Sequence, residues 1–181
     1  MLAACDGSGP KFRNVDMTGA DYAKGFSLTD HNGKSRTLAD FAGKVVVVFF
    51  GYTRCPDVCP TTMVEMKQVM GKLGPDADKV QVLFVTLDPE RDTQQVLAQY
   101  VPAFDPRFLG LYGDSVTTLK TAKDFKVFYE KRAGSDSGSY TLDHTAASYV
   151  FDPQGRLRLY VKYDQIGTLA DDIRTLLKER S

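Results

Sequence analysis

The sequence predicts an α/β domain in which helices cover a central sheet that is parallel or mixed. Residues 45–50 and 80–87 form two apolar runs without polar alternation, which is typical of strands buried on both faces of a sheet. A helical pattern separates the two runs, and this alternation favours parallel strands joined by helical crossovers. With 181 residues, of which 43% are apolar, the chain can bury one sizeable core, so we expect one folded domain.

The elements up to residue 126 follow from local patterns. Residues 26–38 are predicted to form a hairpin, because Asn32-Gly33 favours a tight turn. A helix is predicted over 61–73, where apolar residues recur at helical spacing until a Gly-Pro pair stops the run. The alternation continues with a short helix at 93–100, a strand at 108–112 and a helix at 115–125.

Beyond residue 126 the pattern changes to short strands separated by turns, followed by one amphipathic helix. Strands are predicted at 127–131, 140–143, 147–151 and 157–163, and the closing helix carries apolar residues from Ile166 to Leu177. A central strand that leads into two cysteines at a helix start, with a hairpin later in the chain, is a thioredoxin-like order of elements.

Charge and hydropathy exclude two classes of function. The 23 basic and 23 acidic residues cancel, and no basic run is interleaved with aromatic residues, so we expect no nucleic-acid partner. The longest unbroken apolar run, at 45–50, is far shorter than the roughly 20 residues that a membrane-spanning helix needs. The sequence therefore predicts no transmembrane helix.

The first residues, Met-Leu-Ala-Ala-Cys-Asp, are similar to the end of a bacterial lipoprotein signal in which Cys5 is lipidated. Residues 1–24 are accordingly predicted to be a flexible membrane tether, and residues 25–181 the folded domain. The alternative is a disordered tail with a chance match. A lipidated Cys5 would place the domain outside the cytoplasm, where disulfides persist, and would leave Cys55 and Cys59 as an even pair.

Chemistry concentrates in residues 51–60, which read Gly-Tyr-Thr-Arg-Cys-Pro-Asp-Val-Cys-Pro. Cys55 and Cys59 follow a buried strand and lie at or just before a helix start, where the helix dipole lowers thiol pKa values. We therefore expect both cysteines to be thiolates at neutral pH. A thiolate is both the nucleophile of disulfide exchange and a soft ligand for monovalent copper, so a redox pair and a metal site both remain open. A purely structural disulfide is least favoured, because so short a loop gains little from crosslinking.

The choice between these readings depends on a third ligand. His31 lies in a polar turn sequence and is expected to be an exposed loop residue. His144 lies at a hairpin connection that could reach the cysteines, although a lone histidine is more often structural. Two thiolates and one imidazole would suit copper in either oxidation state, whereas a closed zinc site would need a fourth protein ligand.

The methionines of the 61–73 helix are expected to pack in the core. Asp88, after the second buried strand, is expected to cap a turn rather than to orient a ligand.

These residues together resemble the Sco/SenC family of copper-binding assembly factors for cytochrome c oxidase. The resemblance covers the domain from about residue 26 to the last helix. It is carried, in family order, by Gly-Lys at 43–44, the cysteine segment at 50–60, Thr-Leu-Asp-Pro-Glu-Arg-Asp-Thr at 86–93, Asp-His-Thr at 143–145 and Tyr-Val-Phe-Asp-Pro-Gln-Gly at 149–155. It implies a thioredoxin-like fold with an added β-hairpin, and Cys55, Cys59 and His144 as the copper ligands.

The resemblance also implies a function and partners. We expect a metallochaperone that delivers copper (Cu⁺ or Cu²⁺) to an apo copper-binding subunit of cytochrome c oxidase. The alternative is a thiol–disulfide oxidoreductase in which Cys55 and Cys59 reduce the cysteines of that subunit. A periplasmic copper donor or thiol reductant would be a further partner. The expected location is the periplasmic face of the bacterial cytoplasmic membrane, with the lipid anchor at Cys5.

Overall fold

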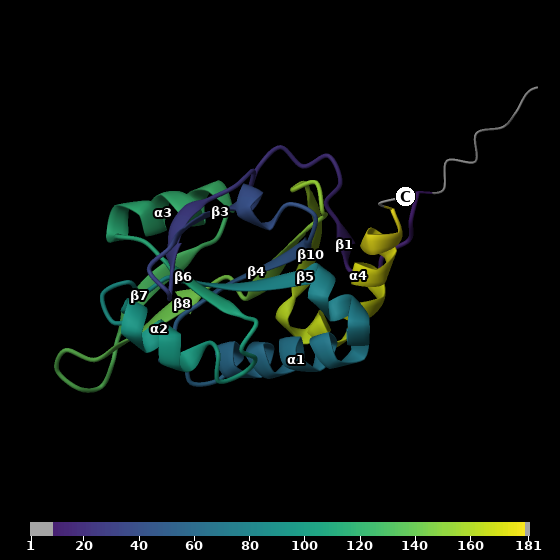
Figure 1. Cartoon of the computed structure of the whole chain (residues 1–181). Helices are drawn as coiled ribbons and strands as arrows, with labels where there is room; N and C mark the ends of the chain where they lie inside the picture. The colour runs from purple at the N-terminus through teal and green to yellow at the C-terminus, as the bar shows by residue number, and fades with distance from the viewer. Residues whose placement is uncertain (1–8, 180–181) are drawn as a thin grey trace, which may run out of the picture.

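A computed structural model describes residues 9–179 and shows a mixed eight-stranded sheet flanked by helices, with a separate two-stranded sheet (Figure 1). The strands of the large sheet lie in the order β1 (Val15–Asp16), β10 (Leu157–Lys162), β9 (Ala147–Phe151), β4 (Val45–Gly51), β5 (Val80–Thr86), β6 (Leu109–Tyr112), β2 (Ser27–Asp30) and β3 (Ser35–Thr37). The α-helices are α1 (Val58–Leu73), α2 (Gln94–Tyr100), α3 (Ser115–Asp124) and α4 (Leu169–Lys178). The predicted fold class is confirmed.

Only the centre of the sheet is parallel. β4 pairs in parallel with β5, and β5 pairs in parallel with β6, whereas the other neighbouring strands are antiparallel. Every residue of β4 and β5 is buried, which explains why their sequences are apolar without alternation. These two strands therefore form the rigid centre from which the following loops extend.

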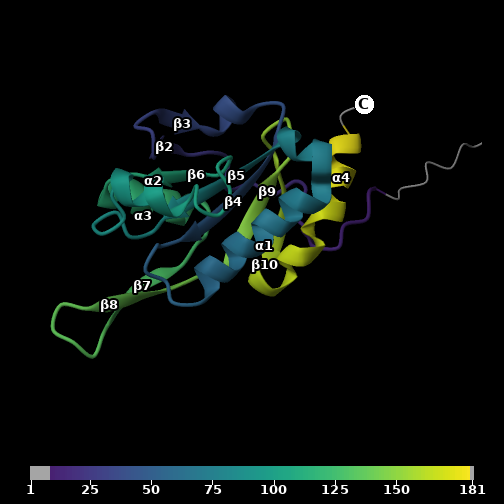
Figure 2. The same cartoon turned by 60° about the horizontal axis from the view of Figure 1, so that its bottom comes forward.

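Helices cover both faces of this centre. α1 and α4 pack against each other on one face, and α3 lies on the opposite side of the sheet (Figures 1 and 2). Consecutive residues of β4 point to opposite faces. Phe49 packs on Phe84, whereas Phe50 packs edge-on against Phe125 and Tyr149. Aromatic contacts on both faces thus fix the strand that precedes the cysteines.

The amino-terminal segment differs from the prediction. The predicted flexible tether covers residues 1–24, yet β1, within it, forms the edge strand of the sheet and pairs with β10. The backbone N–H groups of Arg13 and Asn14 donate to the buried carboxylate of Asp172 on α4. The packed domain therefore begins before residue 25. A two-residue strand has no detectable alternation, and its attachment depends on a partner strand that comes much later in the chain, at Leu159 and Tyr160. Residues 1–6, with the lipoprotein-like pattern at Cys5, lie outside the described residues.

The added hairpin is present as the second, two-stranded sheet. Its strands, β7 (Tyr129–Ala133) and β8 (Tyr140–His144), pair with each other in antiparallel register, and Tyr129 lies opposite His144. The hairpin projects from the body of the domain (Figure 2). His144, at the end of β8, thus lies where the hairpin rejoins the domain.

Candidate metal centre

The two cysteines lie on either side of the start of α1. Cys55 is half-buried in the loop after β4, and Cys59 is fully buried in the first turn of the helix. Both are free thiols. Gly51 ends β4 directly beneath Cys59, and a Cβ atom at this glycine would come within 2.7 Å of the Cys59 sulfur. The close approach of strand and sulfur therefore requires a residue without a side chain.

A buried carboxylate fixes the cysteine loop to the end of β5. Asp92 is fully buried and accepts hydrogen bonds from the backbone N–H of Thr53 at 2.9 Å and from the Thr53 hydroxyl at 2.6 Å. The Thr86 hydroxyl donates to the same carboxylate at 2.7 Å. A buried carboxylate with three donors is well satisfied, so these contacts hold the loop in place.

His144 presents one ring nitrogen to the cysteines. Its Nδ1 lies 3.0 Å from the carbonyl oxygen of Thr145, which can only accept, so Nδ1 carries the proton when the ring is neutral. Nε2 then keeps its lone pair and lies 3.7 Å from the sulfur of Cys59. The ring also packs edge-to-face on Tyr52, with 5.9 Å between centroids. The tautomer and orientation of the imidazole are those of a metal ligand.

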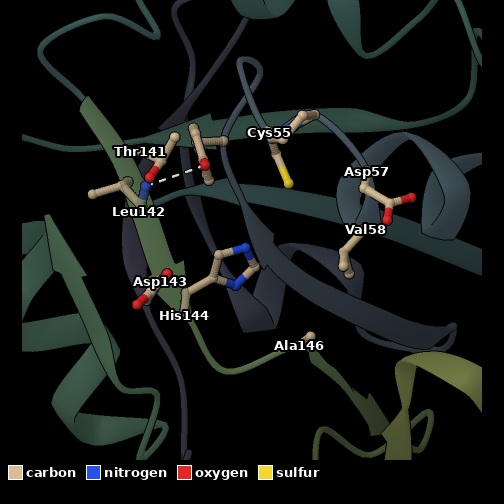
Figure 3. A pocket seen from close by; sticks show the side chains of 10 residues that line it. Cys55, Asp57, Val58, Thr141, Leu142, Asp143, His144 and Ala146 are labelled. Carbon is tan, nitrogen blue, oxygen red and sulfur yellow. Dashed lines mark hydrogen bonds between the residues drawn. The ribbon is translucent and has the colours of Figure 1, made fainter. Parts of the chain in front are cut away.

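The structure brings all three predicted site residues together. The sulfurs of Cys55 and Cys59 and a ring nitrogen of His144 lie within 4.8 Å of one another, a grouping able to hold a metal ion. Cys55 and His144 line an open pocket of about 420 Å³, and Cys59 is buried behind it. In Figure 3 the Cys55 sulfur and the His144 ring point into this pocket, whereas the carboxylates of Asp57 and Asp143 point away. Asp143 instead pairs with Arg132 on the hairpin surface.

The two thiols are not equivalent, which corrects the expectation that both are readily ionised. A hydrogen bond from Cys59 holds the pKa of Cys55 well below its usual range, and the nearby His144 ring lowers it further by a smaller amount. The same hydrogen bond and burial raise the pKa of Cys59. Two sulfurs in contact share one proton, so the half-buried sulfur carries the charge and the buried one keeps the proton.

His31 is not an exposed loop residue. It is buried beside β6, where its Nδ1 accepts a hydrogen bond from the backbone N–H of Gly110 at 3.0 Å. Burial lowers its pKa. The polar turn sequence gave no sign of this, because the burial depends on the distant β6. Met63, Met66 and Met70 are buried in the core, as predicted.

Asp88 does more than cap a turn. Its carboxylate accepts hydrogen bonds from the Tyr140 hydroxyl, on the hairpin, and from Nε of Arg91. The Arg91 guanidinium also donates to the carbonyl of Tyr140. Sequence reasoning missed Arg91, Tyr140 and Tyr52 as parts of the site. The available signal was the run of charged residues at 88–92, after a buried strand. That run does not indicate which distant residues these side chains contact.

Comparison with known proteins identifies the family. A family model described as SCO1/SenC matches residues 15–178, which is nearly the whole described chain. The chain belongs to the SCO1/SenC family. The resemblance predicted from the cysteine segment, the 86–93 segment and the histidine is thereby confirmed. Its relatives include the mitochondrial SCO2 homolog of Mus musculus, which is 41% identical over 132 residues, 72% of this chain and 52% of that protein.

Solved structures of similar proteins agree with this SCO1/SenC assignment. Bradyrhizobium japonicum ScoI with copper bound is 41% identical, has a TM-score of 0.77, and is matched over 84% of this chain and 98% of that one. Apo Sco1 from Thermus thermophilus is 39% identical, has a TM-score of 0.82, and is matched over 94% of this chain and 100% of that one. A more distant protein with the same fold, BsSco, is described as a member of the Sco family of cytochrome c oxidase assembly proteins with a disulfide switch.

The SCO1/SenC match covers only part of the length of some relatives. The chain spans about half the length of the mammalian SCO2 relatives that it matches. Between residues 9 and 179, we find no helix with the length and apolar character needed to span a bilayer. The family includes a protein from Bacillus anthracis that is described as a lipoprotein.

Proposed function

We propose that this chain is a copper chaperone in the assembly of cytochrome c oxidase. Cys55, Cys59 and His144 hold one copper ion, and the cargo passes to an apo copper-binding subunit of the oxidase. The observation that supports this proposal is the convergence of two sulfurs and one imidazole nitrogen within 4.8 Å. Copper-bound relatives such as Bradyrhizobium japonicum ScoI support the choice of metal.

The donor set and its spacing fit copper. Thiolates favour the monovalent ion, and an imidazole nitrogen suits the divalent ion, so this mixed set can hold both. Ligand atoms with metal bonds of roughly 2.0 to 2.3 Å lie at most about 4.6 Å apart, so a small closure of the 4.8 Å grouping suffices. In the neutral ring, Nε2 of His144 keeps its lone pair for the metal, because Nδ1 faces the carbonyl of Thr145.

Differences in burial suggest an order of transfer. Cys55 is half-buried and lines the pocket mouth, whereas Cys59 is fully buried behind it. An incoming cysteine of the acceptor can therefore reach the copper from the side of Cys55 and displace that ligand first. Cys59 then holds the ion in a shared intermediate until a second acceptor ligand binds. This sequence needs no net change in the oxidation state of the copper.

Substituting the nitrogen ligand tests the three-residue site. We expect His144→Ala to lower Cu²⁺ affinity by at least ~100-fold, because loss of a residue that only orients a ligand already costs up to about that much. Cu⁺ affinity should fall less, since two thiolates remain. The matched control is His31→Asn, which removes the other histidine but keeps an acceptor for the Gly110 N–H. Competition titrations with both ions give the result. Unchanged affinity of His144→Ala for both ions would exclude the site.

The asymmetry of the thiols favours a second function, reduction of a disulfide in the oxidase subunit. The Cys55 thiolate attacks the substrate disulfide, forms a mixed disulfide and releases one substrate thiolate. Cys59 then passes its proton to the substrate thiolate already released and attacks the Cys55 sulfur, which releases the second substrate thiolate and leaves a Cys55–Cys59 disulfide. Two electrons pass to the substrate, so a thiol reductant must restore the pair. The lowered pKa of Cys55 and the raised pKa of Cys59 suit these roles.

The reduction potential of the cysteine pair discriminates the two functions. A reductase in an oxidising compartment needs a potential within reach of its partners, whereas inert disulfides lie below roughly −300 mV. Equilibration of the protein with defined thiol buffers, followed by alkylation and mass spectrometry, gives the value. A potential below that limit would remove the exchange function and leave the copper-carrier proposal intact.

We further propose that Cys5 carries a lipid that holds the protein at the periplasmic face of the bacterial cytoplasmic membrane. This proposal rests on the residues before Cys5 in the sequence. There, a periplasmic copper donor or thiol reductant would load or restore the site. Metabolic labelling with a clickable fatty acid should mark the wild type and not Cys5→Ser, and Cys5→Ser should leave the membrane fraction. Labelling that persists in Cys5→Ser would exclude this anchor.

A further inference from the structure

We infer that Asp88, Arg91 and Tyr140 form a positioning cluster that sets the place of the His144 imidazole. These residues do not touch the proposed metal position as ligands. They act on the hairpin strand β8, which starts at Tyr140 and ends at His144. The inference rests on the proposed copper site, because its consequence is a change in how strongly the imidazole contributes to binding.

Asp88 is the fixed point of the positioning cluster. It lies two residues after Thr86, the buried end of β5, and it is itself buried. One carboxylate oxygen accepts from the Tyr140 hydroxyl at 2.6 Å, and the other accepts from Nε of Arg91. Hydrogen bonds to a charged acceptor are roughly twice as strong as neutral ones. The start of β8 is therefore attached to the core by a strong, short contact.

Arg91 holds the same tyrosine from a second direction. Its Nη1 donates to the backbone carbonyl of Tyr140 at 3.0 Å, and its guanidinium lies 3.6 Å from the centre of the Tyr140 ring. Tyr140 is thus fixed through its hydroxyl, its ring and its main chain. Neither the rotation nor the translation of this end of β8 is free.

The position of Tyr140 passes along β8 to His144. Alternate residues of a strand share a face, so Tyr140, Leu142 and His144 point to the same side. Leu142 is buried on that side, while Thr141 and Asp143 are exposed. The backbone N–H of Leu142 donates to the Tyr52 hydroxyl at 3.1 Å, and the Tyr52 ring contacts His144. Figure 3 shows this bond beside the inward-pointing imidazole. The three side chains thus seat one face of β8 against the domain.

The same short segment also fixes the sulfur ligands. Asp92, four residues after Asp88, holds the cysteine loop through Thr53. Residues 88–92 therefore contact the nitrogen side through Asp88 and Arg91 and the sulfur side through Asp92. Because these residues lie in one turn, their spacing sets the distance between the His144 imidazole and the cysteine sulfurs. The two anchors make different predictions, because one acts on the imidazole and the other on the cysteines.

Tyr140→Phe is the sharpest test, because it removes only the hydroxyl that donates to Asp88. We expect Cu²⁺ affinity to fall on the order of tenfold, as is typical when a partner that orients a ligand is lost. Cu⁺ affinity should change less than about threefold, since the thiolates are undisturbed. The Cu²⁺ electron paramagnetic resonance spectrum should show weaker nitrogen coupling. The matched control is Tyr112→Phe on β6. This substitution removes a hydroxyl that donates to the exposed side chain of Gln94 at 3.0 Å.

The apo protein gives a readout that does not depend on copper. Nuclear Overhauser contacts between the rings of His144 and Tyr52 should weaken in Tyr140→Phe and persist in Tyr112→Phe.

Thr53→Val, which loses a hydroxyl bond to Asp92, should lower Cu⁺ and Cu²⁺ affinity together. Intact ring contacts and unchanged Cu²⁺ affinity in Tyr140→Phe would overturn the inference, as would an equal loss for both ions. If His144→Ala changes neither affinity, the copper site itself fails, while the ring contacts still decide whether the positioning cluster exists.

Discussion

The sulfur side of the site lies against the most deeply buried strands of the sheet, whereas the nitrogen side lies on a hairpin whose strands pair only with each other. Cys59 is fully buried in the first turn of α1, directly above Gly51 of β4. His144 ends β8, in which residues alternate between exposed and more buried positions. The difference shows that the core fixes two of the three ligands, and that side-chain contacts from one segment must place the third.

Removing the buried sulfur should have the largest effect. We expect Cys59→Ala to lower Cu⁺ affinity by well over ~100-fold, because one thiolate cannot replace two. Loss of a residue that only orients a ligand costs at most about that much. The fall should exceed that of His144→Ala measured with the same ion. Competition titration with a Cu⁺ chelator gives both values. Equal losses in the two variants would break the proposed division between a fixed sulfur side and an adjustable nitrogen side.

Filling the space beneath Cys59 should disturb the sulfur side alone. A Cβ atom at Gly51 would lie 2.7 Å from the sulfur and 3.0 Å from the Phe49 ring, so Gly51→Ala should cost about 1–3 kcal/mol of unfolding free energy by overpacking. Chemical denaturation gives this value, and Cu⁺ affinity should fall with it.

The matched control for the overpacking experiment is Gly71→Ala. Gly71 lies within α1 with open space around it, so alanine should raise helix stability by roughly 0.5–1 kcal/mol. Stabilisation by both substitutions would show that the strand does not press on the sulfur.

Loosening the hairpin should leave the core intact. Tyr52→Phe removes the hydroxyl that accepts from the Leu142 N–H, which costs about 1 kcal/mol, and keeps the ring that contacts His144. Amide hydrogen exchange should accelerate for β8 and stay unchanged for β4. Faster exchange throughout β4 would mean that the hairpin and the core open as one unit.

The pH dependence of Cys55 reactivity should show the smallest effect. Because the pKa of Cys55 is lowered, its alkylation rate should stay nearly flat between pH 6 and 8, where an ordinary thiol with pKa about 8.5 reacts faster as pH rises. Cys59→Ala removes the main cause, so the pKa rises and the rate at pH 6 falls several-fold. His144→Ala, which removes a lesser cause, should have a smaller effect. A larger effect of His144→Ala would reverse the assignment of the hydrogen bond from Cys59 as the principal cause.

Several features could be predicted from the sequence because they depend on neighbours along the chain. The apolar runs of β4 and β5 need no partner to be recognised as buried strands. The cysteine segment after β4 and the helix that follows are local as well. His144 was a candidate because it lies at a hairpin connection that could reach the cysteines, and the resemblance to the family strengthened this prediction, since a lone histidine is more often structural.

Contacts between distant segments decided the rest. β1 attaches to β10 and α4, His31 is buried by β6, and the Asp88 carboxylate meets Tyr140 from another part of the chain. The unequal pKa values of Cys55 and Cys59 likewise arise from the contact of two sulfurs, not from the helix dipole alone.

The sequence by itself determined the α/β class, the position of the cysteine pair and the types of donor atom, because each of these depends on residue chemistry and short spacing. Only the tertiary structure decided that the hairpin brings Nε2 of His144 to the sulfurs, and that Cys55 rather than Cys59 carries the charge. The physical reason is that burial and hydrogen bonding depend on which distant segments come into contact in the folded chain. Local patterns along the sequence do not show which segments these are.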